Sequence, residues 1–113
     1  MANAIEPSTQ NALLAFRCKL VQHFDVKETV LFGSRAKGTH HAESDTDVAV
    51  LLNGARAKFL ETKFAMDDLA YEVLLDTGVR IQPLPIWTSE WDKPAEYSNP
   101  QLLFNIRREG IVL

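Results

Sequence analysis

A glycine–serine pair and two closely spaced carboxylates are the residues of this chain best suited to chemistry. Gly33 and Ser34 follow one run of bulky residues, and Asp45 and Asp47 begin another. Residues two apart on a strand project from the same face, so both carboxylates should point the same way. Like charges this close repel unless a cation lies between them, and hard oxygen ligands favour Mg²⁺. We therefore expect Asp45 and Asp47 to bind a divalent metal and to act in catalysis.

The Gly33-Ser34 pair is typical of a phosphate-binding turn. Between a strand and a helical turn it exposes backbone N–H groups and one hydroxyl, and Gly33 lets an anion approach without a Cβ in the way. Arg35 and Lys37 follow, where each is either a phosphate ligand or a solvated loop charge. A Gly-Ser pair alone is usually only a turn, and an Asp-x-Asp alone is usually a solvated strand end. The two together predict a site for phosphoryl or nucleotidyl transfer.

The elements that must position these residues alternate between helical and strand patterns. In chain order we expect a helix over 8–24, a strand over 29–32, a helical turn over 34–37, a strand over 46–52, a helix over 56–76, a strand over 79–86 and a final helix between Asn99 and Gly110. Pro83 and Pro85 cannot donate to a ladder, so the third strand should lie at an edge. The fold class is α/β (α+β), a small mixed sheet with helices packed mainly on one face.

Composition limits the remaining possibilities. With 113 residues, we expect a single domain spanning 1–113. With a net charge of −3 the protein has no overall positive potential that would attract nucleic acid, and we expect no direct nucleic-acid binding. The sequence has no apolar run long enough to span a membrane and no signal-peptide pattern, so we expect a cytoplasmic protein. The single cysteine, Cys18, should be a buried or half-buried apolar side chain. His40-His41 is either a metal pair or, more simply, part of a polar loop.

The stretch from Gly33 to Gly38, followed after six residues by Asp45-Thr46-Asp47, resembles the signature of the minimal nucleotidyltransferases. These belong to the DNA-polymerase-β-like superfamily. The resemblance covers the chain from Thr29 to Leu84, and the segment 99–110 is similar to the way many short members end. It implies that Gly33, Ser34 and the cations after them hold the phosphates of ATP, and that Asp45 and Asp47 bind Mg²⁺.

One position departs from the family pattern. Members usually carry a third acidic residue on the strand after the long helix, where it serves the attacking hydroxyl, and Gln82 stands there in this chain. A glutamine cannot act as a base. Glu72, or a carboxylate from a partner, is a candidate substitute.

The resemblance also implies a partner and a reaction. Short members commonly pair with a helical HEPN-type ribonuclease toxin encoded beside them, and neutralise it by moving AMP from ATP to a hydroxyl, typically of tyrosine. The alternative is a binding module that masks its partner by contact, with nucleotide binding vestigial. Either function is compatible with a homo- or hetero-oligomer. An antibiotic-modifying transferase is disfavoured because the chain leaves no room for a substrate domain.

Overall fold

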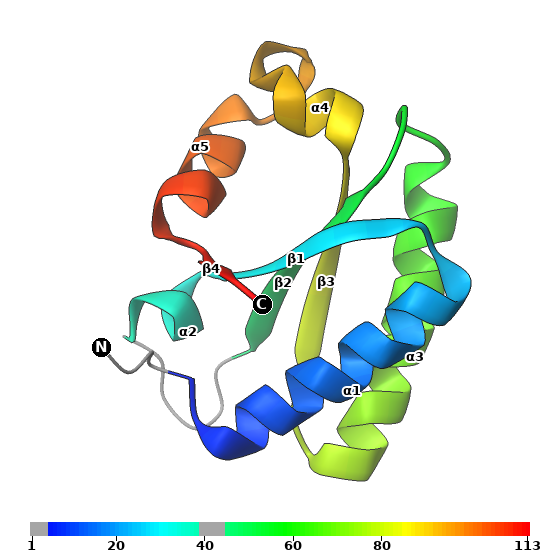
Figure 1. The fold of residues 1–113 in the computed structure, drawn as a ribbon, viewed down its shortest axis with the longest axis vertical. Helices are drawn as coiled ribbons and strands as arrows, with labels where there is room; N and C mark the ends of the chain where they lie inside the picture. The colour runs from blue at the N-terminus through cyan, green and yellow to red at the C-terminus, as the bar shows by residue number, and fades with distance from the viewer. Residues whose placement is uncertain (1–4, 39–44) are drawn as a thin grey trace.

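The computed structural model describes residues 5–38 and 45–113, within which four strands form one mixed sheet (Figure 1). The elements in chain order are α1 (Pro7–His23), β1 (Val26–Phe32), α2 (Ser34–Lys37), β2 (Thr46–Leu52), α3 (Phe59–Thr77), β3 (Ile81–Trp87), α4 (Thr88–Asp92), the 3-10 helix η1 (Pro94–Glu96), α5 (Pro100–Glu109) and β4 (Ile111–Val112). The mixed α/β architecture expected from the sequence is confirmed.

The strands lie in the order β3-β2-β1-β4. β1 runs antiparallel to both β2 and β4, whereas β2 and β3 are parallel and α3 makes the crossover between them. β3 is an edge strand, as Pro83 and Pro85 predict. Because β1 is antiparallel to β2 and β2 is parallel to β3, the C-terminal end of β1 and the N-terminal ends of β2 and β3 lie at the same end of the sheet.

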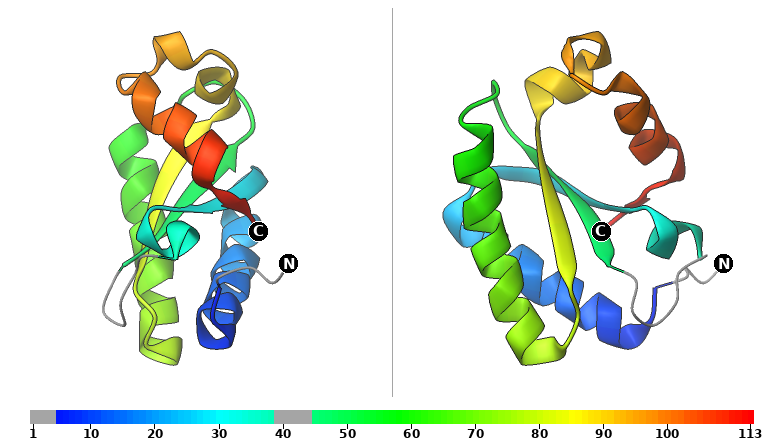
Figure 2. Two further views of the ribbon diagram at one scale, coloured as in Figure 1. Left: turned by 90° about the vertical axis from the view of Figure 1, so that its left-hand side faces the viewer. Right: turned by 180° about the vertical axis from the view of Figure 1, so that it is seen from behind.

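Helices cover both faces of the sheet. On one face α1 and α3 bury a cluster that includes Phe16, Leu20 and Met66 against the strands. On the other face α5 contributes Leu103 and Ile106 to a second cluster, and Figures 1 and 2 show the strands passing between α5 and the α1–α3 layer. The two long helices thus share one face, and the C-terminal helix closes the other.

Local chemistry explains where the helices end. Gly78 takes a left-handed conformation (φ 78°) after α3, and its N–H donates to the Leu74 carbonyl at 2.8 Å. The Asn99 side chain accepts from the Leu102 N–H at 3.3 Å, which caps α5, and Pro100 occupies the first turn. Both boundaries agree with the sequence signals.

Some local features differ from expectation. Cys18 is exposed, and its expected burial is therefore wrong, because the buried side of α1 is formed by Ala12, Phe16 and Leu20 and Cys18 faces away from it. The segment between β3 and α5, for which the sequence predicts no element, contains α4 and η1. No helix in the described part of the chain is both long and apolar enough to cross a bilayer.

Candidate active site

The turn after β1 and the first carboxylates of β2 meet at one point. Phe32 pairs with Asp47 in the antiparallel ladder, so the residue that follows, Gly33, lies beside the Asp47 side chain. A Cβ built on Gly33 would lie 2.5 Å from Asp47 Oδ2 and 3.4 Å from its Cγ. Gly33 also has φ 76° and ψ −154°, a conformation that is essentially restricted to glycine. The structure therefore brings the glycine–serine turn and Asp47 together, and the contact requires glycine.

A single helical turn, α2, follows Gly33. Ser34 begins α2 and is half-buried, and the Lys37 N–H donates to the Gly33 carbonyl at 3.2 Å, which closes a single helical turn. The N–H groups at the start of a helical turn point out of its beginning. Phosphate oxygens could bind there, next to the Asp47 carboxylate.

Asp45 and Asp47 lie on the same side of β2. Thr46 between them is fully buried, so strand alternation turns both carboxylates away from the α1–α3 cluster. Partial burial raises the pKa of Asp47, and the nearby Asp45 carboxylate raises it further. The ionised pair is thus unfavourable on its own, and a bound cation would relieve it.

Arg80 supplies a positive charge beside this pair. Its Nε lies 3.7 Å from Asp45 Oδ1, and the two side chains are 63% and 46% exposed. In the parallel ladder of β2 and β3, Thr46 pairs with Ile81 and Asp47 pairs with Gln82. Continuing this register by one residue places Arg80 next to Asp45. The sequence reasoning missed Arg80, although the register would have revealed it once the parallel pairing of β2 and β3 was known.

Gln82 stands directly beside Asp47, across the parallel ladder. Paired residues of parallel strands project from the same face, so the amide shares the side of the sheet on which Asp47 lies. Gln82 is exposed and also lines a pocket of about 210 Å³ at the outer edge of β3, together with Arg80, Asp67 and Tyr71. Asp67 lies in this pocket because α3 packs against β3.

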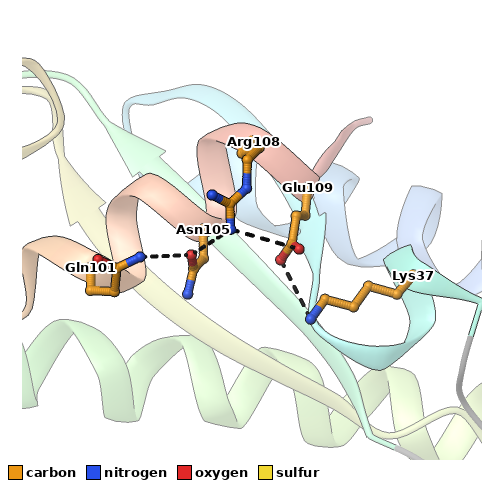
Figure 3. Close-up of polar contacts among 5 residues, drawn as sticks. All are labelled: Lys37, Gln101, Asn105, Arg108 and Glu109. Carbon is orange, nitrogen blue, oxygen red and sulfur yellow. Dashed lines mark hydrogen bonds and ion pairs between the residues drawn. The ribbon is translucent and has the colours of Figure 1, made fainter.

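The two cations after Ser34 are engaged elsewhere in the chain. The Arg35 side chain is buried and its Nη1 lies 3.4 Å from Glu6 Oε1. Lys37 Nζ lies 3.5 Å from Glu109 Oε1 at the end of α5, where Figure 3 shows Glu109 contacted by Arg108 as well. The structure thus gives both side chains partners away from the carboxylate pair, which sequence spacing does not reveal.

Two other candidates lie at different places. Glu72 Oε1 accepts from Lys19 Nζ at 2.9 Å, on the side of α3 that packs against α1. His40 and His41 lie outside the described residues.

Trp87 is buried, and Trp91 stacks against the Arg107 guanidinium, 4.2 Å from ring centroid to Cζ. Trp87 belongs to the cluster beneath α1 and α3, whereas Trp91 packs against the cluster that α5 covers.

Comparisons with known proteins agree with this fold. The family model for the nucleotidyltransferase domain matches residues 12–100, so the chain belongs to the nucleotidyltransferase-domain family. A crystal structure of a toxin–antitoxin with AMP-PNP is similar at 20% identity and a TM-score of 0.61, over 91% of this chain and 70% of that one. A proposed nucleotidyltransferase from Sulfolobus solfataricus is similar at 14% identity and a TM-score of 0.53, over 96% and 86% of the two chains. No curated protein sequence matches the chain.

Proposed function

We propose that this protein transfers AMP from ATP to a hydroxyl of a partner protein, as the antitoxin of a HEPN-type toxin–antitoxin pair. The observation that carries the proposal is the contact between Gly33 and the Asp47 carboxylate, which places the glycine–serine turn beside the acidic pair. Membership of the nucleotidyltransferase-domain family supports the reaction class. The similarity to a toxin–antitoxin structure that contains AMP-PNP motivates the partner and the nucleotide.

In this proposal the glycine–serine turn binds the phosphates of ATP and the two carboxylates bind the metal ion. The N–H groups and hydroxyl of Gly33-Ser34 would hold the outer phosphates of ATP. Asp45 and Asp47 fit Mg²⁺, which takes one or two carboxylates and completes its shell with phosphate oxygens and water. When bound, Mg²⁺ would offset the negative charge of the triphosphate. Burial and, after it, the neighbouring Asp45 carboxylate raise the pKa of Asp47, and a bound cation would offset both effects.

In the reaction, the acceptor oxygen would form a bond to the α-phosphorus while the bond to the departing pyrophosphate breaks. Catalysis of this kind rests on in-line positioning and charge stabilisation. The acceptor hydroxyl would approach along β3, because Gln82 lies next to Asp47 there. Since Gln82 cannot accept the hydroxyl proton, that proton would pass to water, and we expect slow turnover.

The position of Gln82 also supports a second candidate function. A protein that masks its toxin by contact needs no base beside the metal pair, and Arg35 and Lys37 are both paired within the chain. In this alternative the nucleotide site is retained but contributes little to neutralising the toxin.

Mass spectrometry can separate the two candidates. The protein is mixed with the product of the neighbouring gene, ATP and Mg²⁺, and we expect one adenylate to be added to the partner. Asp47→Asn should abolish the addition and leave the circular dichroism spectrum unchanged. A partner that stays unmodified, yet binds Asp47→Asn as tightly as wild type, would establish masking instead.

Gln82→Asp is a useful companion variant. Restoring a carboxylate beside Asp47 should raise the initial rate of AMP transfer, because general-base assistance typically contributes about 10²-fold or more. An unchanged rate in a protein that still binds ATP would show that proton removal does not limit this reaction.

A further inference from the structure

Large apolar side chains gather on the outside of the α1–α3 layer. In the described part of the chain eight large hydrophobic residues are exposed, and six of them lie on these two helices. The six are Leu14, Val21, Leu60, Phe64, Tyr71 and Leu75, each at least 53% exposed. Scattered exposed hydrophobics are normal, whereas a concentration on one face marks an interaction site.

On α3 the exposed residues form a continuous stripe. Leu60, Phe64, Tyr71 and Leu75 are separated by four, seven and four positions, which keeps them on one side of a helix. The opposite side, with Met66, Ala70 and Val73, is buried against the sheet. A helix that packs on one face normally turns a polar face to water, so the folded chain itself gives no reason for the second apolar face of α3.

The charges around the stripe are mostly acidic. α3 carries five carboxylates and a single lysine, Lys63. Lys63 Nζ binds Asp67 Oδ1 at 2.6 Å, and Lys19 from α1 binds Glu72. Within the described residues Asp68 and Asp76 form no ion pair of this kind. The stripe is therefore bordered by negative charge that the chain does not fully balance.

We propose that the outer face of α3 binds an amphipathic helix of a different protein, one with an apolar stripe and lysine or arginine residues on its flanks. Helix-in-groove recognition uses anchors at this spacing, and opposite charge on the two flanks favours the correct partner. This surface is separate from the Asp45–Asp47 pair, and the proposal does not depend on nucleotidyl transfer.

A second copy of this chain fits the surface poorly. Two α3 helices packed antiparallel about the middle of the stripe would bring Asp68 close to its own copy, since Asp67 and Asp68 lie midway between Phe64 and Tyr71. The cations of α1 do not help: Lys19 is bound to Glu72, and Arg17 donates to the Leu113 carbonyl at 3.4 Å. Like charges would thus meet without compensation.

Tyr71 connects this surface to the candidate active site. It belongs to the stripe and also lines the pocket beside Gln82 and Arg80. A helix seated on α3 would cover Tyr71 and hold the adjoining part of its own chain near the outer edge of β3. Docking at this surface would therefore raise the local concentration of a partner's side chains beside the carboxylate pair.

The test uses two synthetic helical peptides of about 20 residues with the same leucine stripe, one with lysine flanks and one with glutamate flanks. Fluorescence anisotropy with the full chain should show binding of the lysine peptide only, weakening as salt is added. In ¹H–¹⁵N spectra the affected amides should lie between Leu60 and Leu75. Phe64→Glu should weaken binding about tenfold or more, as loss of a central anchor does.

Phe104→Glu is the matched control, because Phe104 is 50% exposed but lies on α5, and it should leave peptide binding unchanged. Circular dichroism would confirm that Phe64→Glu stays folded. Asp47→Asn should bind the peptide normally, so a failure of catalysis and a failure of docking are distinguishable. The proposal is overturned if neither peptide binds, if both bind equally, if Phe64→Glu binds as wild type, or if light scattering shows a dimer that Phe64→Glu dissociates.

Discussion

Replacing Gly33 by alanine tests the geometry on which the candidate site depends. The new Cβ would lie 2.5 Å from Asp47 Oδ2, so the carboxylate must move. Turning an aspartate side chain about 30° off its rotamer costs about 0.5–1.5 kcal/mol. Holding alanine at φ 76° and ψ −154° costs about 1–3 kcal/mol more. We expect Gly33→Ala to lower the free energy of unfolding by about 1.5–4.5 kcal/mol.

Thermal unfolding can measure this loss. For a chain of this length 1 kcal/mol shifts Tm by about 4 °C, so the expected decrease is about 6–18 °C. Gly78→Ala is a suitable control: Gly78 has a similar φ of 78° but nothing lies within 4 Å of its Cβ position. It should cost only the left-handed conformation, about 1–2 kcal/mol.

A double-mutant cycle isolates the contact itself. In an Asp47→Ala background the displaced carboxylate is absent, so Gly33→Ala should cost about 1 kcal/mol less than in the wild type. Strict additivity of the two substitutions would refute the claim that the Gly33 turn and the Asp47 carboxylate touch. A Gly33→Ala loss no larger than that of Gly78→Ala would refute it as well.

Three further perturbations test the charges. Because burial and Asp45 raise the pKa of Asp47, its ionised form destabilises the metal-free fold; Asp47→Asn should therefore raise Tm in EDTA at pH 7, and the gain should disappear as pH falls below the unfolded carboxyl value of 3.8. Arg80→Ala removes a cation that competes for Asp45 in an exposed pair; it should barely change stability yet tighten Mn²⁺ binding about two- to fivefold in calorimetry. Arg56→Ala removes the cation that lies 2.9 Å from Oε2 of the buried Glu90 carboxylate, whose Oε1 still accepts the Trp87 N–H at 3.1 Å; it should cost about 1–3 kcal/mol in urea unfolding, partly restored by Glu90→Gln.

Local sequence signals predicted most of the elements and their ends. The strand over 46–52 and the helical turn over 34–37 have the expected bounds, and Pro83 and Pro85 correctly indicated an edge strand. These features depend on a few neighbouring residues: side-chain alternation, missing donors and glycine conformations act within a turn or two. The same is true of the glycine–serine turn and of the shared face of Asp45 and Asp47.

Features that depend on residues far apart in the chain were decided by tertiary structure. β4 pairs with β1 across more than half the sequence, and α5 covers the face opposite α1 and α3. Arg35 is directed to Glu6, and Arg80 reaches Asp45 through the parallel register of β2 and β3. Composition and spacing cannot fix such pairings, because a register is set by how whole elements pack.

By itself, then, the sequence determined which residue types could bind phosphate and metal, and that a strand holds both carboxylates on one side. The tertiary structure brings the glycine–serine turn into contact with Asp47 and places Gln82 and Arg80 beside the two carboxylates. It also leaves a second apolar face of α3 exposed to solvent. The physical reason is that side-chain chemistry and strand alternation are local properties. The spatial neighbours of a residue are set by long-range packing, which depends on all the helices and strands together.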